Sequence, residues 1–424
     1  MKSKKYRVEK DSMGPMKVPV DAFYGPQTQR AVENFPISGT TFFVEFINAI
    51  IIIKRSAAIV NFNLGLIDKS ICDGIVNACD KLLNGSYEEH FPLDIFQTGS
   101  GTSTNMNVNE VISSLANTES NMQIHPNDHV NMGQSSNDTI PTAINISVAL
   151  IISKNLLPNL SNLIESIKVK EEEFKNILKL GRTHLQDATP IALSQEFSGY
   201  RELLTKSKQR LISSHNTLKR LPQGGTAVGT GINTHKNFGK LIAKEISEYT
   251  KLDFIETPNH FEAQSAQDSS VEVAGVLKGL AISLSKIAND VRWLASGPRS
   301  GLGELNIPAV QPGSSIMPGK VNPVICESIL QVSAQVIAND LAITIGALGS
   351  VLELNLMLPL IAHNLLYSTS ILSNSIKVFD NKLIKDLSAN KIKCENYIEG
   401  SLAMCTSLAP IIGYDEAAKI AHES

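Results

Sequence analysis

Apolar residues recur every three or four positions along residues 273–294, which is the spacing of one helix face. The steps alternate between four and three without a break, through Val273, Leu277, Leu280, Leu284, Ile287, Val291 and Leu294. A 3.5-residue period of this kind is typical of helices packed in bundles. It predicts a helix over residues 271–295, which at the α-helical rise would be about 37 Å long.

Two more segments carry similar stripes. One runs, with Asn339 on the same face, through Ile325, Ile329, Val332, Val336 and Ile343. For the other, the capping residues of SSNDTIP predict a helix that starts near Pro141 and continues through Ile144, Val148 and Ile152. Strand signals are few and short, such as KLDFIET at residues 251–257. The pattern predicts an all-α, or mainly α, fold.

Long antiparallel helices with continuous apolar stripes form extended bundles, and stripes of this length favour association with other subunits. We expect a central domain of long helices over residues 136–380. It would be flanked by a smaller N-terminal domain over residues 1–135 and a small C-terminal helical domain over residues 381–424.

Composition narrows the class of protein. The 424 residues are 42% hydrophobic, and 38 basic against 41 acidic residues give a net charge of −3. This balance points to neither a nucleic-acid nor a membrane-surface partner. The apolar run INAIIII at residues 47–53 meets Lys54 and Arg55. It predicts a buried helix, because a membrane span needs about 20 apolar residues.

The cysteines and the N-terminal stretch bear on the compartment. The five cysteines form no C-x-x-C pair, and an odd number fits reduced thiols in a cytoplasmic protein better than a disulfide framework. The opening MKSKKYRVEKDSMG is charged and lacks the apolar core of a secretory signal.

Glycine-rich and proline-rich loops carry the residues that suggest chemistry. In QTGSGTSTNMNVNEV, Ser100 and Thr102 precede a helix, where hydroxyls and free N–H groups can receive an anion. Ser103, Thr104 and Asn105 are better explained as ordinary capping residues. QSSND likewise places polar residues just before a helix. Capping explains one of the three residues Ser135, Ser136 and Asn137.

Two further segments suggest acid–base work and charge stabilisation. GRTHLQDATP joins Thr183 and His184 to the start of another helix, and a histidine among polar neighbours suits proton transfer. PGSSIMPGKVNP, residues 312–323, is not a Walker loop, because five residues separate its glycines and Val321 follows Lys320. Its consecutive backbone donors and one lysine suit stabilisation of an oxyanion.

Other common site motifs are missing from the sequence. GSS is not the G-x-S-x-G of a hydrolase, GTAVGTG is not G-x-G-x-x-G, and H-E-x-x-H does not occur. His125 and His129 in IHPNDH have i,i+4 spacing, but Pro126 and Asn127 indicate a turn. We expect no catalytic metal and no cofactor.

Taken together, the sequence motifs of these loops are specific enough to indicate a protein family. GSSIMPGKVNP resembles the fumarase and aspartase superfamily of lyases, and TGSGT, HPND, QSSND, GRTHLQDATP, GGTAVGTGIN and KIANDVRWLASGPR are similar to the class II fumarases. The resemblance runs from EKDSMG at residue 9 to IGYDEAAKIA. It implies metal-free, reversible hydration of fumarate to L-malate, a step of the tricarboxylic acid cycle, by a homotetramer built round a shared helical bundle.

The resemblance also implies roles for individual residues. Ser314 would take the C3 proton, and the loop around it, including Lys320, would stabilise an aci-carboxylate intermediate. His184, supported by Glu327, would protonate the departing hydroxyl through water. The residues implied to hold the two carboxylates are Ser100, Gly101, Thr102, Ser135, Ser136, Asn137, Thr183, Ser315, Lys320, Val321 and Asn322. A second anion site would comprise His125, Pro126, Asn127 and Asp128.

Some positions depart from the family pattern. Ser103 stands where fumarases usually carry glutamine, and this serine favours the ammonia-lyase branch. His129 stands where aspartate is usual, and residues 111–124 contain no Lys or Arg. The family pattern continues beyond AHES, so the C-terminal domain is expected to be incomplete. Two alternatives stay open: an aspartate ammonia-lyase, which usually shows GRTQLQ, STND and MPAK, and a helical scaffold without activity.

Overall fold

The computed structural model describes residues 5–120 and 123–423. The chain falls into two compact units of three segments each. Unit 1 comprises Met1–Lys154, Ile212–Gly275 and Ala338–Ser370, and unit 2 comprises Asn155–Leu211, Val276–Ile337 and Ile371–Ser424. The three domains expected from the sequence remain a prediction, and residues 1–4, 121–122 and 424 of their ranges lie outside the described residues.

Unit 1 is built mainly from helices of its N-terminal segment. Its elements are β1 (Tyr6–Asp11), β2 (Gly14–Pro19), α1 (Pro26–Asn34), α2 (Val44–Asn63), α3 (Lys69–Asn84), η1 (Glu88–His90), α4 (Thr102–Ser120), η2 (Pro126–Val130), α5 (Ser136–Ile151), η4 (Thr217–Lys219), β5 (Arg220–Leu221), α8 (Phe238–Thr250), β6 (Ile255–Glu256), α9 (His260–Ser265), β8 (Ser350–Val351) and β9 (Leu354–Asn355).

Unit 2 holds one of the longer helices in full and a hairpin. Its elements are α6 (Leu157–Glu173), β3 (Leu178–Thr183), β4 (Gln186–Ala192), β7 (Leu305–Asn306), η5 (Asp380–Ile384), β10 (Ser388–Ala389), α13 (Lys391–Glu399), η6 (Ala403–Ser407), α14 (Ala409–Ile412) and α15 (Tyr414–Glu423). The elements whose residues belong to both units are η3 (Ile152–Leu156), α7 (Leu193–His215), α10 (Asp268–Leu294), α11 (Val324–Ala347) and α12 (Leu358–Phe379).

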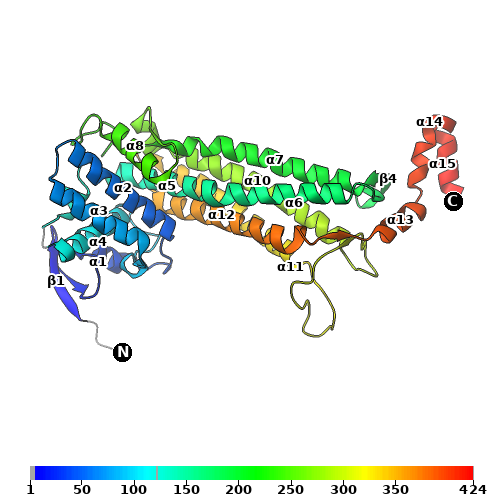
Figure 1. The fold of residues 1–424 in the computed structure, drawn as a ribbon, viewed down its shortest axis with the longest axis horizontal. Helices are drawn as coiled ribbons and strands as arrows, with labels where there is room; N and C mark the ends of the chain where they lie inside the picture. The colour runs from blue at the N-terminus through cyan, green and yellow to red at the C-terminus, as the bar shows by residue number, and fades with distance from the viewer. Residues whose placement is uncertain (1–4, 121–122, 424) are drawn as a thin grey trace. The chain divides into compact units, whose positions relative to one another are not determined.

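Helix α2 forms the centre of unit 1. It contacts α3, α5 and α8, and Figure 1 shows α2, α3 and α4 side by side. Ile50 and Ile53 are fully buried, and buried residues occur almost all round the helix. This is the pattern of a core helix, as INAIIII predicted.

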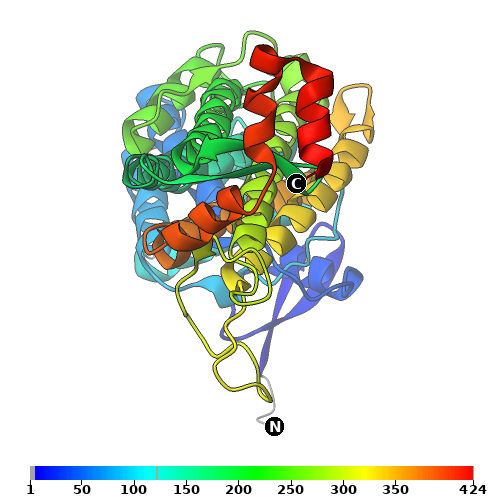
Figure 2. The same ribbon diagram turned by 90° about the vertical axis from the view of Figure 1, so that its right-hand side faces the viewer.

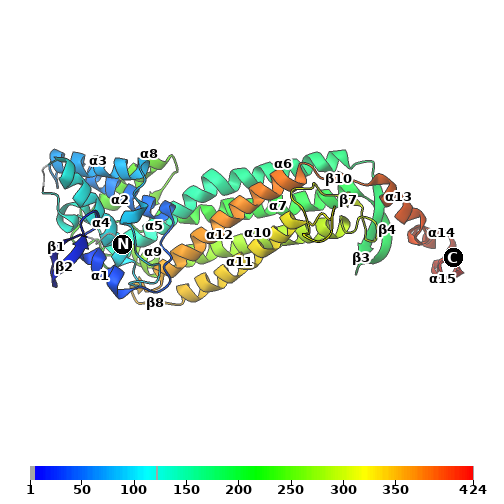
Figure 3. The same ribbon diagram turned by 90° about the horizontal axis from the view of Figure 1, so that it is seen from below.

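Long helices pack side by side within unit 2. Figures 1 and 3 show α6 and α7 running alongside α10 and α12. The Nδ2 of Asn159 on α6 donates to the Ser373 carbonyl on α12 at 3.2 Å, and the Ser333 hydroxyl on α11 donates to the Ala281 carbonyl on α10 at 2.9 Å. The predicted helices over 271–295 and 325–343 are α10 and α11, so the prediction of a mainly α-helical bundle fold is confirmed.

Two expectations about elements were wrong. The helix expected to start near Pro141 is α5, which starts at Ser136 and holds Pro141 inside it, because Ser135 and Asp138 form a capping box that starts the helix earlier. The sequence also indicated no strands around GRTHLQDATP, yet β3 and β4 form an antiparallel hairpin there. KLDFIET does contain the short strand β6, which pairs with β5.

Candidate functional site

The starts of α4 and α5 lie next to each other in unit 1. Gly101 has a φ of +72°, and a Cβ built on it would lie 2.9 Å from the Ile140 side chain on α5. A larger residue would therefore clash and be strained as well. The close approach leaves Ser100 and Thr102 at the N-terminus of α4, with their hydroxyl oxygens 2.8 Å apart.

A turn over residues 131–138, called the 131–138 turn below, leads into α5. The Ser135 hydroxyl oxygen accepts the N–H of Asn137 at 3.2 Å, while the Ser135 N–H donates to the Asp138 carboxylate at 2.9 Å. Capping thus explains Ser135, as the sequence indicated for one residue of the three. The Ser136 hydroxyl and the Asn137 side-chain amide take no part in the cap. The Ser136 oxygen accepts from the Asn105 amide at 3.1 Å, which leaves the Ser136 hydroxyl hydrogen for a ligand.

Asp138 also ties the 131–138 turn to the glycine-rich segment after β5. Its second carboxylate oxygen accepts the N–H groups of Gly224 at 3.0 Å and Thr226 at 2.9 Å. Burial raises the pKa of the fully buried Asp138 carboxyl, and the three backbone N–H donors oppose this rise. The Asn137 amide adds a bond of 2.8 Å to the Ala227 carbonyl. The turn is therefore fixed from the side of residues 222–227.

A buried lysine holds the same turn from the side of α2. The Lys54 ammonium donates to the Asn131 amide oxygen at 2.8 Å and to the Gln134 amide oxygen at 3.0 Å. Lys54 is fully buried, and burial lowers its pKa to about 7 against the attraction of Asp138. The sequence reasoning missed Lys54, which it took only as the charge that ends an apolar run. Its place on a helix buried almost all round was the available signal.

Thr183 and His184 lie at the tip of the β3–β4 hairpin in unit 2. Thr183 pairs with Gln186, so His184 and Leu185 form a two-residue turn, and their φ angles of 57° and 61° are both left-handed. Both residues are exposed. The expectation that this segment leads directly into a helix was wrong, because strand β4 intervenes before α7 starts at Leu193.

A buried ion cluster anchors the base of the hairpin. The Arg182 guanidinium donates to the two oxygens of Glu304 at 3.0 and 2.9 Å, and the Lys179 ammonium lies 3.5 Å from the same carboxylate. Glu304 is fully buried. Because Glu304 starts the segment that continues into residues 305–323, it connects the hairpin to the base of that segment. Paired charges of this kind are costly to separate.

Residues 312–323, called the 312–323 loop below, belong to a long connection that extends away from α10 and α11 (Figures 1 and 2). The loop is closed by its own bonds. The Gly313 N–H donates to the Lys320 carbonyl at 2.8 Å, and the Asn322 amide donates to the Gly313 carbonyl at 2.5 Å. A Cβ on Gly313 would lie 2.3 Å from the Lys320 oxygen, so this closure requires glycine.

Inside the loop, Ser314 is held in a position that favours a negatively charged oxygen. Its hydroxyl oxygen accepts the N–H groups of Ile316 at 3.2 Å and Met317 at 3.1 Å. Two backbone donors aimed at one oxygen stabilise an alkoxide. Lys320 is exposed and lines, with Val321 and Asn322, a pocket of about 610 Å³ that also includes Arg292 of α10.

The predicted site residues therefore form groups that differ by unit. Unit 1 brings together Ser100, Gly101, Thr102, Ser135, Ser136 and Asn137 at the starts of α4 and α5. Unit 2 holds Thr183 and His184 on the hairpin, Ser314, Ser315, Lys320, Val321 and Asn322 in the 312–323 loop, and Glu327 exposed in the first turn of α11. Their assignment to one site remains a prediction.

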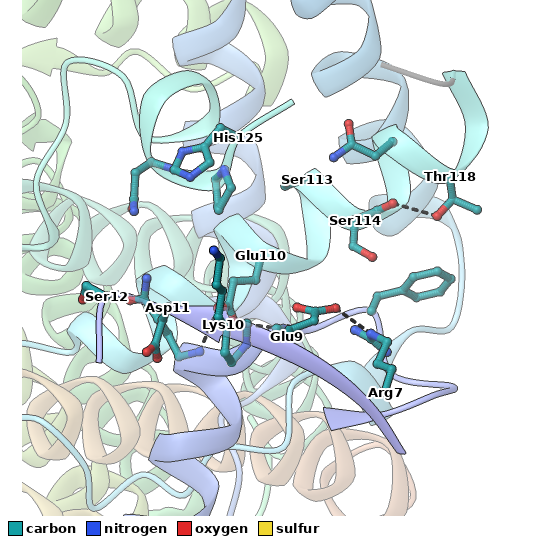
Figure 4. A pocket seen from close by; sticks show the side chains of 17 residues that line it. Arg7, Glu9, Lys10, Asp11, Ser12, Glu110, Ser113, Ser114, Thr118 and His125 are labelled. Atoms are coloured by element: carbon teal, nitrogen blue, oxygen red, sulfur yellow. Dashed lines mark hydrogen bonds and ion pairs between the residues drawn. The ribbon is translucent and has the colours of Figure 1, made fainter. Parts of the chain in front are cut away.

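The predicted second anion site borders a separate pocket of about 800 Å³ in unit 1, which Figure 4 shows between β1 and His125. His125, Pro126 and Asn127 line it, and the basic residues Arg7 and Lys10 come from β1. Arg7 donates to Glu9 and to the carbonyls of Pro19, Ala22 and Tyr24. Lys10 is thus the cation with more freedom to meet a ligand.

The histidines of this segment use their Nδ1 atoms locally. His125 Nδ1 accepts the N–H of Asn127 at 3.3 Å and of Asp128 at 3.1 Å, while His129 Nδ1 accepts the His125 N–H at 2.9 Å. Residues 126–130 form one turn of π-helix, η2. Across residues 5–120 and 123–423, no group of three His, Cys, Asp or Glu side chains is placed to hold a metal ion. The five cysteines are free thiols.

Comparison with known proteins places these features in a family. A family model described as Lyase matches residues 14–338. The class II fumarate hydratase of Helicobacter pylori strain J99 is 49% identical over 98% of this chain and 91% of that protein. The class II fumarate hydratase of Oceanobacillus iheyensis is 48% identical over 99% and 92%. The crystal structure of class II fumarase from Schistosoma mansoni matches with a TM-score of 0.96 at 40% identity, covering 99% of this chain and 92% of that one.

Proposed function

Because the chain belongs to the class II fumarate hydratase family of lyases, we propose that it catalyses the reversible hydration of fumarate to L-malate. The observation that most supports this proposal is the pair of backbone N–H groups on the Ser314 oxygen. A serine hydroxyl is a weak base unless its alkoxide is stabilised, and these donors supply that stabilisation.

In the direction of malate dehydration, the Ser314 alkoxide takes the C3 proton. The electron pair of that C–H bond moves into the adjacent carboxylate and forms an aci-carboxylate, which Lys320, Asn322 and loop N–H groups stabilise. The pair then returns to form the C2–C3 double bond as the C2 hydroxyl leaves in the anti direction. His184, supported by Glu327, protonates that hydroxyl through a water, so the products are fumarate and water.

Hydroxyl and amide donors hold the two substrate carboxylates in this proposal. They come from Ser100, Thr102, Ser136 and Asn137 in unit 1 and from Thr183, Ser315 and Asn322 in unit 2. The chemistry needs no metal ion, because the charge that develops is on carboxylate oxygens that these donors already bind. Activity should therefore persist after exhaustive chelation, and a loss restored by a divalent ion would overturn the metal-free mechanism.

One assay tests the activity and the alternatives. The absorbance of the fumarate double bond is followed with malate and then with aspartate. Turnover of malate alone supports the proposal. Turnover of aspartate supports an ammonia-lyase, which Ser103 favours but which GRTHLQ, SSND and MPGK do not, and silence with both supports a scaffold without activity.

We also propose a homotetramer whose sites combine residues of different subunits. Helix α11 supports it, because Ile337, Leu341, Ile345 and the following Leu348 are exposed at helical spacing, Leu341 by 60% and Leu348 by 80%. Monomeric proteins rarely expose an apolar stripe of this kind. Among residues 5–120 and 123–423, Val324–Ala347 is also one of two helical stretches with the length and hydropathy of a membrane span, the other being the mostly buried Ser136–Glu173. Packing against other subunits would cover it.

Complementation tests the shared site. Ser314→Ala and His184→Asn are each expected to be inactive, and the two are co-expressed or refolded together. If the two residues of one site come from different chains, random mixing leaves about a quarter of sites with both groups intact, so about a quarter of wild-type activity returns. Mixed tetramers as inactive as each parent would show that both residues of a site belong to one chain.

The proposal places the reaction in the tricarboxylic acid cycle and the protein in the cytoplasm. The free, mostly buried cysteines support a reducing compartment. Cell fractionation followed by the malate assay tests the location, and activity recovered only from a membrane or secreted fraction would contradict it.

A further inference from the structure

We propose that Lys54 is a positioning residue for substrate binding, which fixes the direction of a hydrogen-bond chain so that the Ser136 hydroxyl donates to a substrate carboxylate. The inference deepens the proposed function and rests on it. Its basis is the buried polar network between α2, α4 and the 131–138 turn in unit 1.

The chain starts at Lys54, which the nearby Asp138 carboxylate favours as an ammonium, and an ammonium can donate hydrogen bonds but cannot accept them. The side-chain oxygens of Asn131 and Gln134 must therefore face it, at 2.8 and 3.0 Å. With its oxygen fixed in this way, Gln134 turns its NH₂ group to the Val130 and Met132 carbonyls. Asn131 turns its own NH₂ group to the Gln134 carbonyl. One ammonium thus decides the orientation of both amides.

The Asn131 oxygen passes this direction on to α4. It accepts the NH₂ groups of Asn105 and Asn109, each at 3.2 Å, in addition to Lys54. A flipped Asn131 would place its NH₂ group against three donors, which is excluded on chemical grounds. Asn105, whose NH₂ group is directed here, donates with the same group to the Ser136 hydroxyl oxygen at 3.1 Å. Ser136 is therefore an acceptor within the network.

Because the Ser136 oxygen accepts from Asn105, its hydroxyl hydrogen remains for another partner. Asn105, Asn109 and Lys54 are at most 1% exposed, whereas Ser136, in the first turn of α5, is also buried but keeps 8% of its surface exposed. An anion at this helix N-terminus would receive both the hydroxyl hydrogen and the free N–H groups. The network is built so that its last member is a donor, which is what a carboxylate requires.

A purely structural role explains Lys54 less well. Its neighbour Arg55 shows what a structural cation does on this helix, since it pairs with Asp80 at 2.7 Å and lies 3.7 Å from Glu245. The two hydrogen bonds of Lys54 go instead to neutral amide oxygens, and a fully buried ammonium bound to amides alone is costly. A methionine would fill the same space without this cost, but it would not orient Asn131 and Gln134.

A double-mutant cycle tests the inference in the full chain. Lys54→Met and Ser136→Ala are each expected to raise the KM for malate and fumarate about 10-fold while kcat changes less than about 3-fold, because one donor to a charged group is lost. If Lys54 acts through Ser136, the KM of the double variant is about 10-fold above that of the wild type, as in each single variant, and not about 100-fold above it. Additive effects, or a wild-type KM in Lys54→Met, would overturn the inference.

Two further variants keep the test decisive. Asn105→Ala leaves Lys54 in place and interrupts the chain between Asn131 and Ser136, so it should reproduce the KM effect and the non-additivity even if Lys54→Met does not fold. Ile50→Ala is the matched control, because Ile50 is buried on the same helix but outside the network. It should lower the unfolding midpoint and leave KM unchanged. A raised KM in Ile50→Ala would mean that loosening α2 is sufficient, which contradicts a positioning role.

Measurements on the wild-type protein distinguish failure of the inference from failure of the proposed function. Turnover of malate by the wild type tests the function alone, whereas the cycle compares variants of an active enzyme. If the wild type acts on aspartate instead, the same cycle is run with aspartate, because the carboxylate that Ser136 would bind is common to both substrates. If it acts on neither, the cycle is run on the Kd for fumarate.

Discussion

The 131–138 turn and the 312–323 loop both carry serines proposed to act on the substrate, yet they are ordered in different ways. The turn is held from two sides by buried groups, Lys54 from α2 and Asp138 towards residues 224–226. The loop is closed by bonds among its own residues, and Ser315–Val321 are exposed. The proposed binding groups are thus built into the core of unit 1, whereas the proposed base stands on a segment of low local stability.

This difference separates activity from stability. A change in the loop should affect turnover with little effect on unfolding, because few buried contacts depend on it. Loss of the Asp138 carboxylate, which supports the turn through three backbone N–H groups, should lower the stability of unit 1 and substrate affinity together.

The largest expected effect is on turnover. Ser314→Ala removes the proposed base and should lower kcat about 10²–10⁴-fold, with an unchanged unfolding midpoint, and His184→Asn should do the same. Steady-state kinetics and thermal unfolding of the purified variants check this. Turnover of Ser314→Ala at the wild-type rate would remove Ser314 from the mechanism.

The next largest effect is on stability. Asp138→Asn keeps the shape of the side chain but turns an NH₂ group towards backbone N–H donors, so we expect a loss of about 2–4 kcal/mol in the free energy of unfolding. The exposed Asp73→Asn is the matched control and should stay within about 0.5 kcal/mol of the wild type. Urea unfolding measures both, and equal midpoints for the two variants would mean that Asp138 does not support the turn.

A smaller effect distinguishes closure of the loop from its flexibility. Gly313→Ala would place a methyl group 2.3 Å from the Lys320 oxygen and should lower kcat about 10-fold, by opening the loop around Ser314. Gly319→Ala meets no atom within 4 Å, although its φ of +78° brings strain, so its effect should be smaller. If Gly319→Ala has the larger effect, conformational freedom rather than closure is what the loop needs.

The smallest expected effect is a loss of folding stability at acidic pH. Burial lowers the pKa of His90, His215 and His363, all in unit 1. The unfolded chain therefore binds more protons below its ordinary histidine pKa of about 6.5, so stability is present above that pH and falls as the pH drops through and below it. His90 Nδ1 accepts the Phe23 N–H at 3.3 Å, so protonation would set two N–H groups against each other.

Unfolding midpoints at pH 7.5 and 5.0 measure this effect, and His90→Gln should lose less stability between the two than the wild type does. Hydrogen exchange would show the loss in unit 1 rather than unit 2. Equal losses in the wild type and the variant would exclude His90 as a source.

The sequence predicted the fold well where periodicity carried the information. The apolar steps from Val273 to Leu294 predicted α10, because packing in a bundle requires that spacing. The β3–β4 hairpin was missed because its turn is His184–Leu185, which lacks the Asn-Gly or Asp-Gly that usually marks such a turn. Pro141 was taken as a helix start because a proline in the second turn of a helix is unusual.

Within the candidate site, the sequence indicated groups that touch a ligand better than groups that support them. Ser135, Ser136 and Asn137 are adjacent in one motif, so a joint role could be proposed from the sequence. Lys54, Asn105 and Asp138 bond to partners 26–86 residues away in the chain, namely Asn105 to Asn131, Lys54 to Gln134 and Asp138 to Gly224. No local pattern reports a contact that only tertiary packing creates.

The tip of the β3–β4 hairpin has a consequence for engineering. His184 and Leu185 adopt left-handed φ angles that glycine or asparagine would adopt at lower energy, by about 1 kcal/mol for each residue. At His184 the proposed role in proton transfer is a reason to keep the residue, whereas Leu185 is exposed and has no proposed role. A more stable variant could therefore be sought with Leu185→Gly, next to the proposed proton donor rather than far from it. At this hairpin, stability can therefore be increased at one turn residue while the residue beside it, proposed to transfer a proton, is kept.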